Sequence, residues 1–194
     1  MLGAHYDAYS NLYPGANDNA SSCVILLNLI DKLKDSNLSI DFVFFDKEEM
    51  DINRQFAQGS KEYINIIGKD NIKGMINLDM CGMGSNIVIH PEDFNKNVLS
   101  EYPFKGIIKD CKNILSRDPG GDNYSFSLNN IPNIMLFNSS DNDLVWYNNF
   151  DKGIYSYNAD FLNTMHTEND TIDTFDESGM EMIYNYLYNH LKDK

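Results

Sequence analysis

The chain has 194 residues, of which 42% are hydrophobic and 23% charged, a balance typical of one globular domain and not of a disordered segment. Its formal net charge of −14 argues against nucleic acid and anionic membrane surfaces as partners. No apolar run is long enough to span a membrane, and no signal-peptide pattern opens the chain. We therefore expect a single domain over residues 1–194. The sequence as it stands predicts a cytoplasmic protein, whereas a signal-bearing segment ahead of it would imply a secreted or cell-surface one.

In the first half of the chain, short apolar runs predict strands, and segments dense in apolar residues predict helices. The expected elements are a short strand at 2–7, a largely buried helix from 23 to 34–37, a buried strand at 42–45, a loop at 51–58, a helix at 60–67 with Tyr63, Ile66 and Ile67 facing inward, and a strand at 74–78.

The second half continues the alternation of strands and helices. The expected elements are a strand at 86–90 stopped by Pro91, an amphipathic helix within 92–118 at about 104–115, a short helix at 122–128, a strand at 132–137, a functional loop with some hairpin character at 138–163, and a helix at about 177–191. This alternation predicts a three-layer α/β/α domain with a twisted, mostly parallel mixed sheet and a site at the carboxyl ends of the strands.

The three cysteines are widely spaced, odd in number and without the spacing of a zinc knuckle. We expect Cys23, Cys81 and Cys111 to be buried free thiols and not to form a disulfide.

Residues with metal-binding side chains follow the predicted strands. His5 ends the first strand, Glu48 and Glu49 follow the strand at 42–45, and Asp79 follows the strand at 74–78. A further histidine, His166, lies in the loop that follows the last strand. If the strands are parallel, their carboxyl ends meet at one edge of the sheet, where these side chains would gather.

Two other acidic residues extend this group. Asp7 is two residues from His5, so on an extended chain both face the same way, and its carboxylate is placed to support a metal-binding imidazole. Asp18 precedes the helix that begins near residue 23, where it would either cap the helix or reach toward a cation.

Histidines and carboxylates without cysteine suit zinc and also manganese or cobalt. One cation would leave this many acidic groups in mutual repulsion. Two divalent ions that share a bridging carboxylate would balance the charge.

The segments AHYD, GANDNAS, FDKEEM, NLDM and HTENDT occur in this order within a stretch that runs from residue 3 to about residue 174. In sequence and spacing they resemble the metal-binding motifs of the zinc aminopeptidases of peptidase family M28. The segment from Gly121 to Phe126 is a further, weaker match.

The resemblance implies a role for each residue. His5 and Asp79 would bind one Zn²⁺, Glu49 and His166 the other, and Asp18 would bridge both. Glu48 would be the general base that acts on the water between the metals, and Asp7 would support His5. The implied reaction is hydrolysis of the first peptide bond of a peptide with a free amino terminus, with Mn²⁺ or Co²⁺ as possible substitutes for zinc.

Three alternatives remain open. A glutaminyl cyclase has a very similar fold with one zinc, and the HYD and FFD-x-EE segments would suit it. A family-like domain that no longer catalyses serves as a scaffold in some receptor ectodomains. A calcium-binding module is disfavoured, because calcium takes oxygen ligands and would leave both histidines without a role.

The chain departs from the family pattern in three places, one of which is Cys23, where a small residue is common after the GANDNAS motif. Family members carry further strands before the AHYD motif, so we expect a missing amino-terminal segment or a trimmed sheet with an unpaired edge. Such an edge favours association, and a homodimer is a possible state. The segment between Glu49 and Gly59 is longer than is usual in the family, so the rim of the site should differ.

Overall fold

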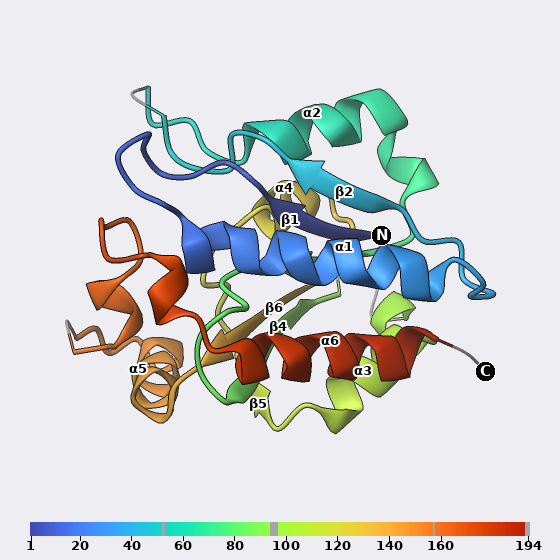
Figure 1. Ribbon diagram of the computed structural model, residues 1–194. Coiled ribbons are helices and arrows are strands. Elements are labelled where there is room, and N and C mark those ends of the chain that lie inside the picture. Colours follow the sequence, from blue (N-terminus) through green and yellow to red (C-terminus); the bar gives the residue numbers. More distant parts are fainter. Residues whose placement is uncertain (52, 94–96, 157, 193–194) are drawn as a thin grey trace.

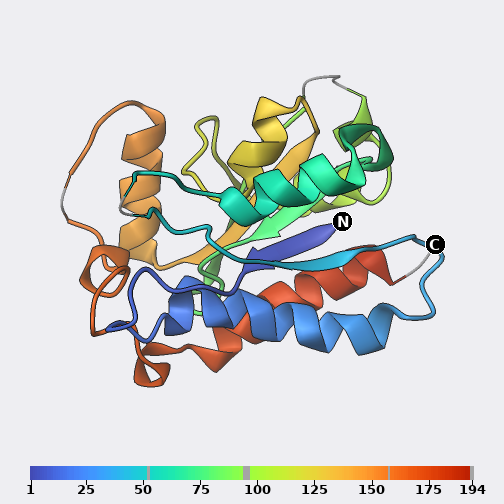
Figure 2. The same ribbon diagram turned by 90° about the horizontal axis from the view of Figure 1, so that it is seen from above.

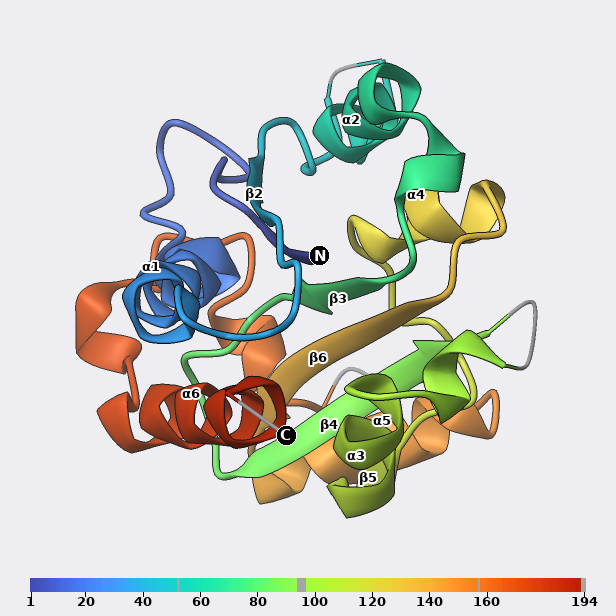
Figure 3. The same cartoon turned by 90° about the vertical axis from the view of Figure 1, so that its right-hand side faces the viewer.

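The computed structural model of the chain describes residues 1–51, 53–93, 97–156 and 158–192. Its strands are β1 (Leu2–His5), β2 (Phe42–Phe45), β3 (Met75–Leu78), β4 (Asn86–Glu92), β5 (Asn113–Ile114) and β6 (Asn133–Ser139). They form one sheet in the order β2-β1-β3-β6-β4-β5 (Figure 3). β2, β1, β3 and β6 are parallel, whereas β4 is antiparallel to β6 and parallel to β5. The prediction of a mostly parallel mixed sheet is therefore confirmed.

Helices cover both faces of the sheet, as Figures 1 and 2 show. One face packs against α1 (Ser21–Leu33), α3 (Phe104–Asp110) and α6 (Glu177–Leu191), and the other against α2 (Gln58–Ile67), α4 (Asn123–Leu128) and α5 (Asp141–Asp151). Short helical turns occur at Ala16–Ala20, Lys69–Asn71, Val98–Ser100, Phe161–Asn163 and Ile172–Thr174. Within the described residues, every helix is too short or too polar to cross a membrane.

The apolar pattern of the sequence accounts for this arrangement. The central strands β3 and β6 are buried along their whole length, as expected for parallel strands covered on both faces. On α6, Ile183, Leu187 and Leu191 recur every four residues and are buried against the sheet. The side chain of Asp176 caps this helix by accepting a hydrogen bond from the Ser178 N–H at 3.0 Å. The three cysteines are free, as predicted; Cys81 and Cys111 are buried, whereas Cys23 is only half-buried.

Two predictions at the far edge of the sheet were wrong. β4 does not stop at Pro91 but continues to Glu92, since a proline is tolerated where its missing N–H is not needed for a ladder hydrogen bond. The helix predicted at 104–115 ends at Asp110, and β5 follows it. The buried positions Ile107, Cys111 and Leu115 keep a helical spacing, but pairing of β5 with β4 overrides it.

Two further predictions also need correction. Ile66 and Ile67 do not face inward but are 72% and 39% exposed; Ile64 is the buried apolar residue of α2, and Tyr63 is half-buried. The segment 138–163, expected to be a loop, contains the eleven-residue helix α5. Residues 52, 94–96 and 157, which fall in the predicted segments 51–58, 92–118 and 138–163, lie outside the described residues.

β2 forms an edge of the sheet, with β1 as its neighbour. The helices beside it carry exposed apolar side chains, among them Leu27 at 58% and Ile30 at 39% on α1, and Ile66 on α2. An open strand edge flanked by apolar surface favours association.

We therefore expect the chain to form a dimer through the β2 edge at micromolar concentration. Light scattering after size exclusion would measure the mass. Leu27→Glu should shift the chain toward monomer, whereas Leu128→Glu, at an equally exposed position on α4 (59%), should not. A wild-type chain that stays monomeric at every concentration would contradict this expectation.

Candidate metal centre

The carboxyl ends of β1, β2 and β3 lie at one edge of the sheet, on the left of Figure 1. His5 is the last residue of β1, Glu48 and Glu49 follow β2, and Asp79 follows β3. Asp18 lies in the turn before α1, and His166 lies in the long connection after α5. The structure thus brings together the seven residues singled out from the sequence, Asp7 included.

Two groups of possible ligands share one carboxylate. In the first group, His5 Nε2 lies 3.2 Å from Asp18 Oδ1 and 3.6 Å from Asp79 Oδ1. In the second group, His166 Nε2 lies 3.3 Å from Asp18 Oδ2 and 3.1 Å from Glu49 Oε2. The two oxygens of Asp18 therefore face different histidines. Asp18 is not the helix cap that was considered, because Ala20 occupies that position without a side-chain cap.

The tautomer of His5 determines whether its Nε2 atom has a lone pair that requires a proton or a metal cation. The Nδ1 atom lies 3.1 Å from the Asp7 backbone carbonyl, which only accepts hydrogen bonds, so Nδ1 carries the hydrogen. In neutral imidazole, Nε2 then offers a lone pair to the surrounding carboxylates. The lone pair and the carboxylate oxygens repel each other. Because His5 is 1% exposed, water does not relieve this repulsion. A proton or a metal cation at Nε2 would relieve it.

The pKa values of the metal-free site express the same excess of negative charge. Burial raises the pKa of Glu48, His5 lowers it, and the carboxylates of Asp79 and Asp122 raise it, so that it reaches about 9. Burial lowers the pKa of His166, but hydrogen bonds to Asp18 and Glu49 outweigh this and raise it to about 10. The four carboxylates of Asp18, Glu48, Glu49 and Asp79 would carry four negative charges when ionised, and two divalent cations would balance them.

Two more carboxylates hold the backbone that carries these groups. Asp7 accepts hydrogen bonds from the backbone N–H groups of Glu48 at 3.1 Å and Glu49 at 3.2 Å, and its carboxylate is 3.5 Å from His5 Nδ1. Asp170 accepts from the backbone N–H groups of Asn17 at 2.7 Å and Asp18 at 3.0 Å. The support of His5 by Asp7 is thus mainly through its backbone carbonyl, whereas its carboxylate orients the two glutamates.

Left-handed backbone conformations occur beside the candidate ligands. Lys47 precedes Glu48 with φ 55°, Met80 follows Asp79 with φ 50°, and His166 itself has φ 57°. Non-glycine residues adopt this conformation at a cost of about 1–2 kcal/mol each, so packing must hold them in place. The His166 ring stacks on Tyr9 with a centroid distance of 4.2 Å.

Sequence reasoning missed two acidic residues of the site. Asp170 is the fifth residue of the HTENDT segment. Asp122 lies in the weaker match and is fully buried beside Glu48; burial raises its pKa to about 7. The sequence indicates Asp170 and Asp122 only in that both lie in segments that resemble the family. Their roles depend on contacts with residues distant in the chain.

A pocket of about 390 Å³ adjoins the candidate ligands. Its wall is largely apolar and comes from the loop after β2, from β6, and from α5 and the segment that follows it. The apolar lining residues are Met50, Phe56, Met80, Pro119, Met135, Trp146, Tyr147, Phe150, Phe161, Leu162 and Met165.

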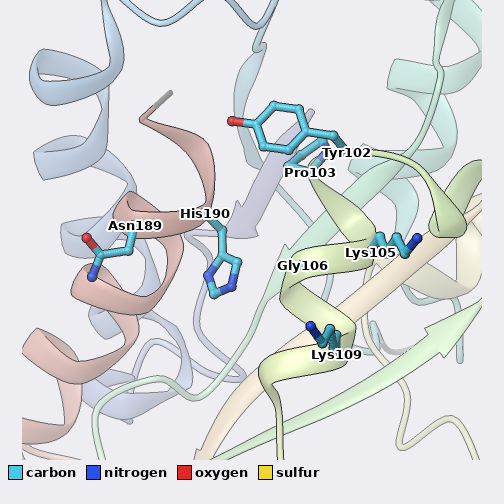
Figure 4. A pocket seen from close by; sticks show the side chains of 7 residues that line it. All are labelled: Tyr102, Pro103, Lys105, Gly106, Lys109, Asn189 and His190. Atoms are coloured by element: carbon cyan, nitrogen blue, oxygen red, sulfur yellow. The ribbon is translucent and has the colours of Figure 1, made fainter. Parts of the chain in front are cut away.

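A second hollow of about 380 Å³ lies between α3 and the carboxyl end of α6 (Figure 4). Lys105 and Lys109 project from α3, and His190 lies on α6. The residues that line it supply no carboxylate, so it lacks the ligands of a metal site.

The family model described as Peptidase family M28 matches residues 1–190. The chain belongs to peptidase family M28. A search of curated proteins found no significant match.

Solved structures of two aminopeptidases and a glutaminyl cyclase share the fold. The zinc aminopeptidase BSAP from Bacillus subtilis matches with a TM-score of 0.70 and 21% identity over 98% of this chain and 46% of its own. The LapA aminopeptidase of Legionella pneumophila matches with a TM-score of 0.68 and 18% identity, over 97% and 50% of the two chains. A glutaminyl cyclase from an Acidobacteriales bacterium has a TM-score of 0.66 and 19% identity, over 97% and 66%.

The chain spans about half the length of these two aminopeptidases. At such identities the likeness shows the fold, and the fold is common to aminopeptidases and a cyclase. The roles of the seven candidate residues in this M28 chain remain predictions.

Proposed function

We propose that the chain is the single catalytic domain of a di-zinc aminopeptidase that removes the first residue from peptides with a free amino terminus. The observation that carries this proposal is the position of Asp18, whose two oxygens face His5 and His166 in two separate ligand groups. A carboxylate shared in this way suits two ions better than one.

The donor set fits zinc. His5, Asp79 and Asp18 would hold one ion, and His166, Glu49 and Asp18 the other, with imidazole and carboxylate ligands that also suit Mn²⁺ or Co²⁺. The lone pair of His5 Nε2 is buried among carboxylate oxygens, which supports a cation at that place. When bound, zinc polarises a carbonyl group and lowers the pKa of water.

Glu48 is placed to move the proton. Its carboxylate is buried and lies 3.9 Å from His5 Nε2, at the floor of the pocket. In the proposed reaction Glu48 accepts the proton of the attacking water and passes it to the leaving amine. Asp7 holds the Glu48 and Glu49 backbone through two hydrogen bonds, which fixes the two carboxylates relative to each other.

The pocket wall supports a preference for peptides that begin with a large apolar residue. Aromatic and methionine side chains line it, so an apolar substrate side chain would lose contact with water there and a charged one would be desolvated without a partner.

We expect leucyl- and phenylalanyl-anilides to be cleaved with a kcat/KM at least about 100-fold above that for aspartyl-anilide. Phe150→Ala, in the pocket wall, should reduce this preference by roughly 10-fold. Tyr155→Ala is the matched control, since Tyr155 packs on Phe150 with centroids 5.9 Å apart but lies outside the pocket. Equal cleavage of all substrates would contradict the preference, and cleavage of none with two metals bound would favour an inactive scaffold.

A glutaminyl cyclase is the second candidate. It is favoured by the likeness of the fold to a solved glutaminyl cyclase, 66% of whose chain is covered by this one. The cyclase hypothesis predicts one bound zinc and conversion of amino-terminal glutamine to a cyclic product without hydrolysis. Metal analysis together with glutaminyl-anilide and leucyl-anilide assays separates the two functions.

A further inference from the structure

We propose that His90, Glu92 and Asp118 form an additional binding site for a divalent transition-metal ion, separate from the two groups that share Asp18. Each of the three residues offers a ligand atom, and these atoms all lie within 4.8 Å of one another. Bonds of about 2.0–2.2 Å place the donor atoms around one ion at most about 4.4 Å apart. Small side-chain movements would therefore bring all three onto one ion.

The backbone of β4 and of the segment before α4 brings these three residues together. His90 and Glu92 are two apart on β4, so their side chains project from the same face of the sheet. They pair with Met135 and Asn133 of β6, on the face that α4 covers. Asp118 comes from the segment between β5 and α4.

His90 has the tautomer of a metal ligand. Its Nδ1 lies 3.2 Å from the Leu115 carbonyl oxygen, which only accepts, so Nδ1 carries the hydrogen and Nε2 the lone pair. His90 is 5% exposed, and its Nε2 has no hydrogen-bond partner in the part of the chain that the structure describes. A buried, unpaired nitrogen lone pair next to two carboxylates has no favourable protein partner, because all three groups are acceptors.

Each carboxylate is held by hydrogen bonds of its own. Glu92 accepts from the Ser127 hydroxyl, which in turn accepts from Asn133 Nδ2 at 3.0 Å. Asp118 Oδ1 accepts from the Gly120 N–H at 3.0 Å and from Asn123 Nδ2 at 2.9 Å. Supporting hydrogen bonds of this kind orient metal ligands and are typical of built metal sites.

The donor set selects the class of ion. One imidazole nitrogen and two carboxylates suit Zn²⁺ or Mn²⁺, whereas Ca²⁺ prefers oxygen ligands alone. Glu92 and Asp118 together supply two negative charges, which match a divalent ion. Because Asp118 immediately precedes Pro119 and Gly120 of the pocket wall, an ion here would also fix that part of the wall.

The test compares Glu92→Gln/Asp118→Asn with the wild-type chain at buffered free zinc, with zinc per chain measured by mass spectrometry. We expect the double variant to bind one zinc fewer, or to bind that zinc at least about 100-fold more weakly. Asp110→Asn is the matched control, since Asp110 pairs with His190 at 3.1 Å but the two belong to no group of three possible ligands among the described residues, and it should bind as the wild type does. An unchanged zinc content and affinity in the double variant would overturn the proposal.

A second measurement needs no variant. In the wild-type chain, zinc should shift the ¹⁵N resonance of His90 Nε2 to the range of a metal-bound imidazole, whereas His190 should not change. A His90 resonance that stays that of a free neutral ring at saturating zinc would overturn the proposal. Neither result depends on how many ions bind at Asp18.

Discussion

Replacing Glu48 with glutamine is expected to lower turnover by about 10²–10⁴-fold while both metals stay bound. The substitution keeps the shape of the side chain but removes the proton acceptor. Glu48 belongs to neither ligand group, although its carboxylate lies 3.9 Å from His5 Nε2. Metal content and turnover number, measured on the same preparation, check this expectation.

Glu49→Gln is the matched comparison, one residue along the chain. Its carboxylate lies 3.1 Å from His166 Nε2, so the substitution should weaken one metal, and excess zinc should partly restore activity. If Glu48→Gln loses metal and Glu49→Gln keeps it, the two roles are reversed. If neither substitution affects turnover, this edge of the sheet is not the active site.

Asp18→Asn is expected to weaken both metals together, each by at least about 100-fold. The two oxygens of Asp18 lie 3.2 Å from His5 Nε2 and 3.3 Å from His166 Nε2, so a neutral amide disturbs both groups at once. Equilibrium dialysis against buffered zinc would give the number of ions and their affinities.

Single-group substitutions provide the control for this experiment. Asp79→Asn and Glu49→Gln each change one ligand group, so each should weaken one ion and spare the other. An Asp18→Asn chain that keeps one ion at the wild-type affinity would show that Asp18 is not shared.

The sequence predicted those features that depend on short stretches of chain. The apolar run Phe42–Phe45 identifies β2, although the strand lies at the sheet edge and only Phe45 is fully buried, not the whole strand as predicted. The four-residue spacing of Ile183, Leu187 and Leu191 identifies α6. Parallel pairing then places His5, Glu48 and Asp79 at one edge without further information.

Other features depend on contacts that no local pattern encodes. The helical spacing of Ile107, Cys111 and Leu115 concealed β5, which forms only because β4 is beside it. Lys47 and Met80 have positive φ angles that packing maintains. Because neither residue is a glycine, the sequence does not indicate a left-handed conformation there. The last third of the chain contains several aspartates, and local sequence does not single out Asp170 among them. Only the fold shows that Asp170 contacts the Asp18 backbone.

The contact of Asp170 with the backbone of Asn17 and Asp18 can form only late in the synthesis of the chain. Asp170 is separated from the Asn17 N–H that it holds by 153 residues, and His166 is almost as far from Asp18. Chains emerge from the ribosome at about 5–20 residues per second, so roughly 8 to 30 seconds separate the appearance of the two halves of the centre. A nascent chain that stops before residue 166 lacks one histidine of the centre, whatever else has folded. In the proposed enzyme, chains that stop before His166 would therefore lack the metal ligand that His166 supplies and would not be active.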